Sequence, residues 1–147
     1  MTVTDASPLI ALDRVGRLGL VPAVLGAVAA PPAVIREFGH RPDWLEERAP
    51  VNLPLVRALR GQLDEGEAEA LALAVDLGAR AVLLDEKKGR RVATDLGVPV
   101  LGTAGLLLRA KRAGELPAVR PVLDALADDG FRLAPSLYEG VVERAGE

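Results

Sequence analysis

The alternation of short apolar runs with helical segments constrains the fold of this sequence more than any other feature. The run Ala81 to Leu84 is continuously apolar, which is typical of a central parallel strand covered on both faces. Shorter runs at Val3-Thr4 and Ala27 to Ala29 precede it, and Val98 to Leu101 follows it. Because parallel neighbours need crossover connections, this pattern predicts an α/β protein, a three-layer α/β/α sandwich with a central parallel sheet.

Residues with known preferences for helix ends mark the segments between these strands. A helix is predicted from about Ser7, and another is predicted to begin at Pro31-Pro32. Asp64 is the expected N-cap of a strong helix through Leu77. Two more helices are expected over residues 86–97 and 102–111.

The remaining segments carry weaker signals. The polar, proline-rich segment Gly39 to Pro54 is predicted to be a surface loop or short helices. After residue 115 we expect additional C-terminal packing helices, one with an apolar stripe and a last one bearing Val141 and Val142. The stripe either enters the core or faces an inhibitory partner or a second subunit, and the segment around Trp44 is the other candidate for such a surface. The stripe consists of Leu116, Val119, Leu123 and Leu126.

Composition excludes several kinds of site. The length of 147 residues predicts one domain, residues 1–147. Cysteine is absent and His40 is the one histidine, which excludes thiolate sites, clusters of imidazole ligands and cysteine nucleophiles. The formal charge of −3 argues against a broadly basic surface. Prolines break the uncharged stretch Leu18 to Ile35, so we expect no membrane span and a cytoplasmic protein.

Two carboxylates follow predicted strands directly. Asp5 comes after Val3-Thr4, and Asp85 comes after Ala81 to Leu84. In an open parallel sheet, ligands bind beyond the carboxyl ends of the strands, so both side chains are candidates for a site. The alternative is that each simply caps the following helix.

Two further carboxylates lie on predicted helices. Glu67 shares a direction with the apolar residues of its helix, whereas Glu65 and Glu69 fall on another side, where a solvated charged face is expected. A carboxylate on an apolar stripe is costly to bury unless a cation or hydrogen bonds receive it. Glu37 either joins these acids or pairs with Arg36 or Arg41 on the surface.

Three or four carboxylates gathered without histidine or cysteine favour a hard cation such as Mg²⁺ or Mn²⁺. Such an ion polarises a phosphate oxygen and activates water for in-line attack. Four basic residues follow Asp85, and they either hold phosphates or neutralise the local acids: Lys87, Lys88, Arg90 and Arg91.

These features resemble the PIN-domain nucleases, and in particular a PIN-like branch related to the toxin ribonucleases of bacterial toxin–antitoxin operons. The motifs that carry the resemblance occur in the order of the family and cover nearly the whole chain. They are D-A-S-P-L-I-A-L at Asp5 to Leu12, P-P-A-V-I-R-E at Pro31 to Glu37, L-D-E-G-E-A-E-A-L-A-L-A at Leu63 to Ala74, L-L-D-E-K-K-G-R-R-V-A at Leu83 to Ala93, and G-T at Gly102-Thr103.

The resemblance implies a role for each matching residue. It implies that four carboxylates are catalytic and hold Mg²⁺ or Mn²⁺: Asp5, Glu37, Glu67 and Asp85. It implies that Ser7 and Thr103 contact the substrate; for Thr103, capping the following helix is the alternative. Arg90, one of the basic residues after Asp85, is a third candidate for substrate binding. The sequence departs from the family at Glu67, where many members have aspartate, and after Asp85, where toxin members have an aromatic residue. Glu65, Glu69 and Glu86 are therefore further candidates for the metal site.

The activity that the resemblance implies is metal-dependent endoribonuclease cleavage of RNA, as the toxin of a toxin–antitoxin pair. A cognate antitoxin protein and a homodimer are the partners to expect. Two alternatives remain at this point: a catalytically silent PIN-like binding module, and a phosphorelay receiver, which also places acids at the ends of parallel strands.

Overall fold

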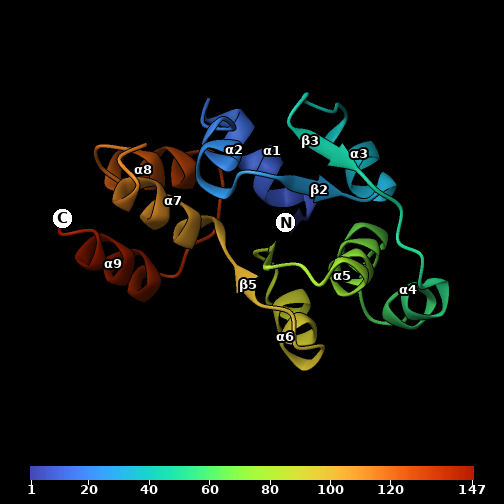
Figure 1. The fold of residues 1–147 in the computed structure, drawn as a ribbon. Helices are drawn as coiled ribbons and strands as arrows, with labels where there is room; N and C mark the ends of the chain where they lie inside the picture. The colour runs from blue at the N-terminus through green and yellow to red at the C-terminus, as the bar shows by residue number, and fades with distance from the viewer.

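A computed structural model describes residues 1–147 and contains one five-stranded sheet in which every neighbouring pair is parallel. The order of the strands is β3-β2-β1-β4-β5, and Figure 1 shows β3 and β2 in the upper part of the view and β5 in the lower part. The sheet confirms the predicted α/β class. The strands are β1 Thr2–Thr4, β2 Val28–Ala30, β3 Leu45–Glu47, β4 Ala81–Leu83 and β5 Val100–Leu101.

The strand order places a switch point between β1 and β4. The chain moves outward from β1 through β2 to β3, then returns to the other side of β1 as β4 and continues outward to β5. In open α/β sheets, the crevice for ligands opens at such a reversal, beyond the carboxyl ends of the strands. The receiver alternative requires the order 2-1-3-4-5, which this sheet does not have.

Nine helices surround the sheet, and the last two, α8 and α9, form the predicted C-terminal addition. Figure 1 shows α7, α8 and α9 gathered at the left of the view, with α4 and α5 at the right. None of the helices combines the length and the hydropathy that crossing a membrane requires. The helices are α1 Ala6–Arg14, α2 Leu20–Leu25, α3 Pro32–Phe38, α4 Leu53–Leu59, α5 Glu65–Leu77, α6 Lys87–Asp95, α7 Thr103–Arg112, α8 Arg120–Asp128 and α9 Pro135–Arg144.

One hydrophobic cluster of 40 buried residues joins the sheet to its helices. Val3 of β1 and Leu83 of β4 are fully buried, as expected for strands covered on both faces. Helix α5 packs against β1 and is buried on most sides, because short alanine side chains alternate with Leu71 and Leu73. The buried sheet therefore gives the crevice between β1 and β4 a rigid floor.

Two predictions made for loops and packing helices are wrong. The segment Gly39 to Pro54 contains strand β3, which pairs with β2 along its backbone. The side chains of β3 do not follow the alternating pattern of a strand, because Leu45 is buried whereas Glu46 and Glu47 are both exposed. Exposed charges are nevertheless common on edge strands, where they prevent further pairing.

The apolar stripe after residue 115 does not lie on one helix. Leu116 and Val119 precede α8, and only the other two residues of the stripe belong to it. All four side chains are buried in the core of the chain, so the stripe offers no surface to a partner. Trp44, the other candidate for a partner surface, is half-buried and packs against the same core.

The buried face of α5 generates the first prediction. Leu71→Ala should lower the free energy of unfolding by roughly 2–5 kcal/mol, because a fully buried leucine leaves a cavity when it is truncated. Leu53→Ala, at a side chain that is 53% exposed on α4, is the control and should change stability by less than about 0.5 kcal/mol. Urea denaturation followed by circular dichroism measures both. Equal losses would contradict the placement of α5 in the core.

Candidate functional site

The crevice between β1 and β4 begins at Asp5. Its backbone N–H donates to the carbonyl of Leu83 at 3.0 Å, which continues the pairing of the two strands. Asp5 then becomes the N-cap residue of α1 in an extended conformation, but its carboxylate accepts no capping hydrogen bond. The side chain is only 4% exposed. Capping therefore does not account for the buried Asp5 carboxylate.

The first turn of α5 brings a second pair of carboxylates to the crevice. Asp64 accepts a hydrogen bond from the Glu67 N–H at 2.8 Å, and Glu67 reaches back toward the Asp64 N–H at 3.4 Å. This capping box confirms Asp64 as the N-cap. Gly66 lies between them, and a Cβ atom there would be 3.6 Å from Oδ1 of Asp5 and 3.7 Å from Oδ1 of Asp64. The start of α5 thus stands directly against Asp5.

Glu67 is the acid with the least satisfied environment. It is 6% exposed, and its Oε2 atom is fully buried without a hydrogen-bond partner. A Cβ atom at Gly89 of α6 would lie 2.8 Å from this oxygen, so a larger residue there would require the Glu67 side chain to move. A buried acceptor without a partner is costly, so Glu67 is placed to receive a cation or a hydrogen-bond donor.

Asp85 is fixed by the start of α7. Its two carboxylate oxygens accept hydrogen bonds from the Thr103 N–H at 2.8 Å and the Thr103 hydroxyl at 2.6 Å. Thr103 is fully buried, so its hydroxyl positions Asp85 and is not exposed to a phosphate. Thr103 does not cap α7 through its own side chain, because Gly102 holds the N-cap position. Asp85 instead accepts the hydrogen bond from the first N–H of α7, that of Thr103.

Glu37 is exposed and lies next to Asp64, at the edge of these carboxylates. It lines a cavity of about 410 Å³ together with Asp64 and Gly66. Glu37 makes no ion pair with Arg36, which instead pairs with Glu65 at 3.0 Å. Glu37 forms no ion pair with Arg41 either, so the surface pairing is absent, and the charge of Asp64 acts on its carboxylate.

The proximity of these acids and their burial raise the pKa values of three of them: Asp5, Glu37 and Glu67. Burial raises the pKa of Asp5 from its ordinary 3.8 to about 7, against a hydrogen bond from the Ala6 N–H, and the charges of Asp64, Glu37 and Asp85 raise it further. Burial likewise raises the pKa of Glu67, with contributions from Asp64 and Asp5. The pKa of Glu37 is raised by burial and by the charge of Asp64.

Asp64 is the member of this cluster that sequence reasoning missed. It was assigned only as a helix cap, yet its charge acts on three neighbours: Asp5, Glu37 and Glu67. The available signal was its place three residues before Glu67, since the two ends of a capping box lie together. We name these five carboxylates the acid cluster: Asp5, Glu37, Asp64, Glu67 and Asp85.

Other candidates lie outside the acid cluster or have other partners. Ser7 is exposed and lines a separate groove with Arg14 and Asp129. Glu65 pairs with Arg36 and Arg60, Glu69 accepts from the Ala33 N–H at 3.2 Å, and Glu86 caps α6. Arg90 lines a cavity beside Asp85, which places it close to the acid cluster.

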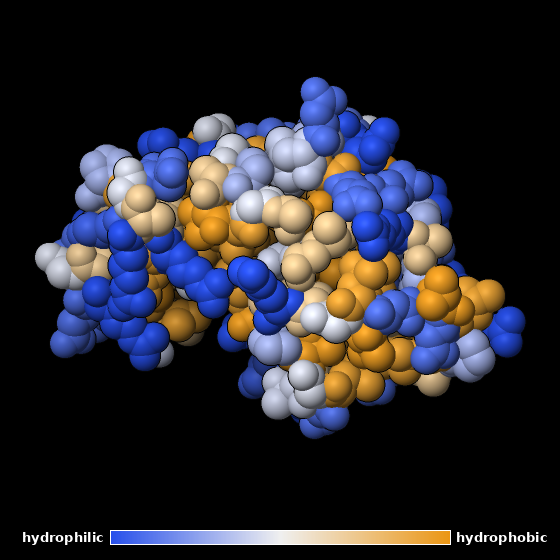
Figure 2. All heavy atoms as spheres, viewed as in Figure 1, coloured by the Kyte–Doolittle hydropathy of each residue, from blue (hydrophilic) through white to orange (hydrophobic).

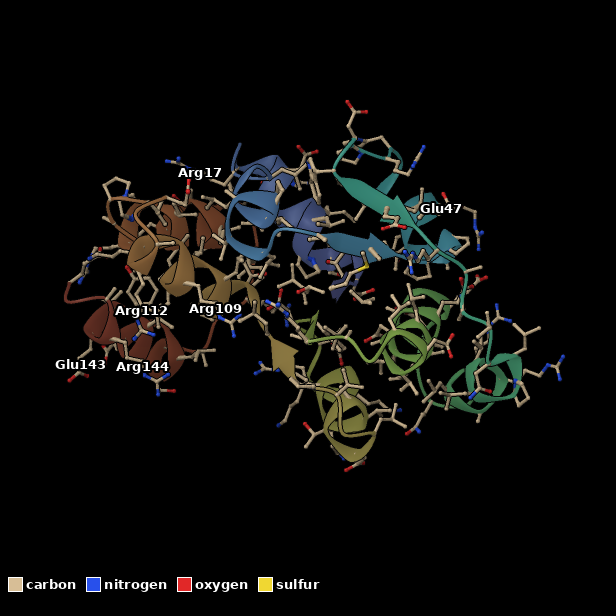
Figure 3. The ribbon with its side chains drawn as sticks, in the orientation of Figure 1. Arg17, Glu47, Arg109, Arg112, Glu143 and Arg144 are labelled. Atoms are coloured by element: carbon tan, nitrogen blue, oxygen red, sulfur yellow. The ribbon has the colours of Figure 1, made fainter.

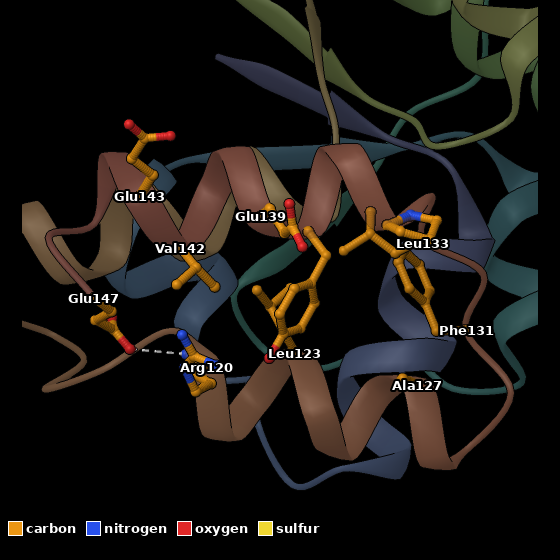
Figure 4. A pocket seen from close by; sticks show the side chains of 11 residues that line it. Arg120, Leu123, Ala127, Phe131, Leu133, Glu139, Val142, Glu143 and Glu147 are labelled. Carbon is orange, nitrogen blue, oxygen red and sulfur yellow. Dashed lines mark hydrogen bonds between the residues drawn. The ribbon is translucent and has the colours of Figure 1, made fainter.

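A wide groove on the surface lies away from the acid cluster. It has a volume of about 600 Å³ and opens between α8 and α9, where Phe131, Leu133 and Val142 contribute apolar walls (Figure 4). None of the predicted site residues lines it.

The acid cluster fits a hard divalent cation by its donor chemistry. All of its donors are carboxylate oxygens, the ligands that Mg²⁺ and Mn²⁺ prefer. No lysine or arginine forms an ion pair with Asp5, Glu67 or Asp85, and the buried Oε2 of Glu67 has no partner. As the side chains stand, no three of them converge as ligands of one ion.

Comparison with known proteins decides the family. The family of PIN domains described as DUF3368 matches residues 1–147. The chain belongs to the PIN-domain family. PIN domains are generally nuclease domains that typically use divalent metals and act on RNA, which agrees with the resemblance found in the motifs. No curated protein matches the chain.

The acid cluster of this PIN domain generates a prediction about pH. Between pH 3.8 and about 7 the unfolded chain releases the proton of Asp5 while the native protein keeps it. Stability of the metal-free protein should therefore fall as pH rises through this interval. Asp5→Asn should flatten the fall, and thermal melts in EDTA between about pH 5 and pH 8 measure it.

The control is Asp95→Asn, which removes an exposed carboxylate at the end of α6. It should leave the pH profile of the wild type unchanged. A wild-type melting temperature that rises across the interval would contradict the crowding of acids around Asp5.

Proposed function

We propose that this PIN domain is an endoribonuclease that hydrolyses RNA phosphodiester bonds with Mg²⁺ or Mn²⁺ bound at the acid cluster. The observation that carries the proposal is the unpartnered Oε2 of Glu67, buried beside Asp5 and Asp64 at the switch point of the sheet. Burying several acids without a cation is unfavourable, so these carboxylates are suited to be the protein ligands of a metal ion.

Four carboxylates of the cluster are the proposed catalytic groups and metal ligands: Asp5, Glu37, Glu67 and Asp85. When bound, Mg²⁺ or Mn²⁺ supplies a Lewis acid for a phosphate oxygen and lowers the pKa of water. Thr103 positions Asp85 through its two hydrogen bonds. Arg90 offers a guanidinium beside Asp85, suited to a phosphate of the substrate. Ser7 remains a proposed substrate contact, although it lines a different groove.

The cellular role that we propose is the toxin of a toxin–antitoxin pair, acting in the cytoplasm and held in check by a cognate antitoxin. The resemblance of the motifs to toxin ribonucleases supports this role. A homodimer is also proposed. The alternative is a PIN-like binding module without catalytic activity, which differs in having no affinity for Mn²⁺ in calorimetry.

Cleavage assays test the catalytic proposal. The purified protein should degrade RNA in Mg²⁺ or Mn²⁺, and EDTA should stop the reaction. Glu67→Gln should lower the rate by more than the roughly 10–100-fold that loss of an outer-shell partner costs at metal sites. Glu69→Gln is the matched control on the same helix, since its amide oxygen can still accept from the Ala33 N–H. Cleavage that persists in EDTA, or equal losses in the two variants, would refute the mechanism.

Growth assays test the cellular role. Expression of the wild type alone should slow growth, and co-expression with the product of the neighbouring gene should relieve it. Glu67→Gln should be harmless at the same expression level, because it removes the proposed catalytic carboxylate. A wild-type protein that is harmless when overproduced would count against a toxin.

A further inference from the structure

A second cavity shares Asp85 with the acid cluster. It has a volume of about 230 Å³ and is bounded by the segment from β5 into α7, by α9 and by Arg90 of α6. Figure 2 shows an indentation between the C-terminal helices at the left and the region of α6 below, with hydrophilic atoms along its upper side. The cavity therefore joins the C-terminal helices to the edge of the candidate active site.

Two arginines give this cavity its charge. Arg90 and Arg144 line it, both side chains are exposed, and neither forms an ion pair. Nη1 of Arg90 is 3.8 Å from the place that a Cβ atom on Gly102 would occupy, and Oδ1 of Asp85 is 3.1 Å from the same place. Arg90 thus lies over Gly102, immediately beside Asp85.

Aliphatic side chains supply the rest of the wall. Leu108 of α7 and Leu137 and Val141 of α9 line the cavity. Leu137 is 46% exposed, so this wall keeps apolar surface in contact with water. Covering that surface with a flat apolar group would release water and stabilise a complex. The cavity thus combines two free guanidinium groups with an uncovered apolar wall.

These features select one class of ligand. Guanidinium groups form paired hydrogen bonds with phosphates, and an aliphatic wall suits the face of a base. The volume is smaller than the roughly 300–1,000 Å³ of a site for a drug-sized ligand, which suits a single nucleotide unit. Arg90 and Arg144 outnumber Asp85, the one acid of the lining, so the cavity presents net positive charge.

We propose that this cavity binds the nucleotide next to the scissile bond, with the phosphate on Arg90 and Arg144 and the base against Leu137 and Val141. The proposal rests on the proposed ribonuclease function and assigns α9 to substrate binding.

The charges on α9 support the placement of the phosphate at Arg90 and Arg144. Figure 3 shows Arg144 on α9 and two arginines of α7, Arg109 and Arg112, gathered at the C-terminal helices. The groove on the other side of α9 is lined by three glutamates, Glu139, Glu143 and Glu147, and by one arginine, Arg120. The face of α9 at the cavity is therefore the more favourable of the two for a polyanion, because the opposite groove carries net negative charge.

Binding of a labelled, single-stranded RNA octamer in EDTA tests the proposal, because cleavage is stopped while the chain's own residues still bind. Arg144→Gln should weaken binding and lower the slope of log Kd against log salt by about 0.7, the value for one lost phosphate contact on a single strand. Arg17→Gln removes the same charge at an exposed residue outside the cavity and should leave the slope closer to that of the wild type.

A second variant separates the base from the phosphate. Leu137→Ala should weaken binding without changing the salt slope, since it removes apolar contact only, and thermal melts confirm that it remains folded. Leu53→Ala on α4 is its control. Equal losses in Arg144→Gln and Arg17→Gln, or unchanged binding in Leu137→Ala, would overturn the subsite.

The two proposals fail separately. If the wild type cleaves RNA but Arg144→Gln binds the octamer with an unchanged slope, the subsite is wrong and the ribonuclease stands. If binding depends on Arg144 and Leu137 while neither metal supports cleavage, the cavity is an RNA-binding site and the catalytic proposal fails. If the Arg144→Gln change weakens only binding of a partner protein, the cavity is a protein interface and the subsite is refuted.

Discussion

The parallel pairing of β1 with β4 is the constraint on which the rest of this protein depends. It places Thr4 opposite Leu83, so the chain leaves both strands at the same height, and Asp5 and Asp85 follow within two residues of those ends. Helix α5 returns the chain from β3 to β4 and packs against β1, which brings its first turn to the same edge. The topology therefore brings these carboxylates together at one edge of the sheet.

Keeping those carboxylates together without a cation opposes folding. Burial and mutual repulsion both raise the pKa of Asp5 and Glu67, so the native state holds protons that the unfolded chain releases. The large core supplies the compensating free energy, since 40 residues pack in one cluster. Sites of this kind commonly trade stability for function, and the glycines beside Asp5 and Glu67 show that the backbone also accommodates the crowding.

Much of this arrangement could be predicted from the sequence, wherever the signal was local. Asp5 and Asp85 followed from their places after apolar runs, and Glu67 was separated from Glu65 by helical direction alone. Strand β3 could not be predicted, because backbone pairing with β2 holds it and its side chains are mostly charged. The bonds from Thr103 to Asp85 depend on a contact across 18 positions of the chain, which no periodicity reveals.

The two roles of Asp64, as a helix cap and as a charge in the acid cluster, limit the substitutions that this position accepts. The same carboxylate receives the Glu67 N–H at the start of α5 and repels its neighbours in the acid cluster. A substitution that relieved the repulsion by removing the charge and the acceptor would also leave the helix uncapped, at a typical cost of about 1 kcal/mol. The electrostatic repulsion and the helix cap thus depend on one side chain, and only a residue that keeps the acceptor without the charge, such as asparagine or serine, would separate them.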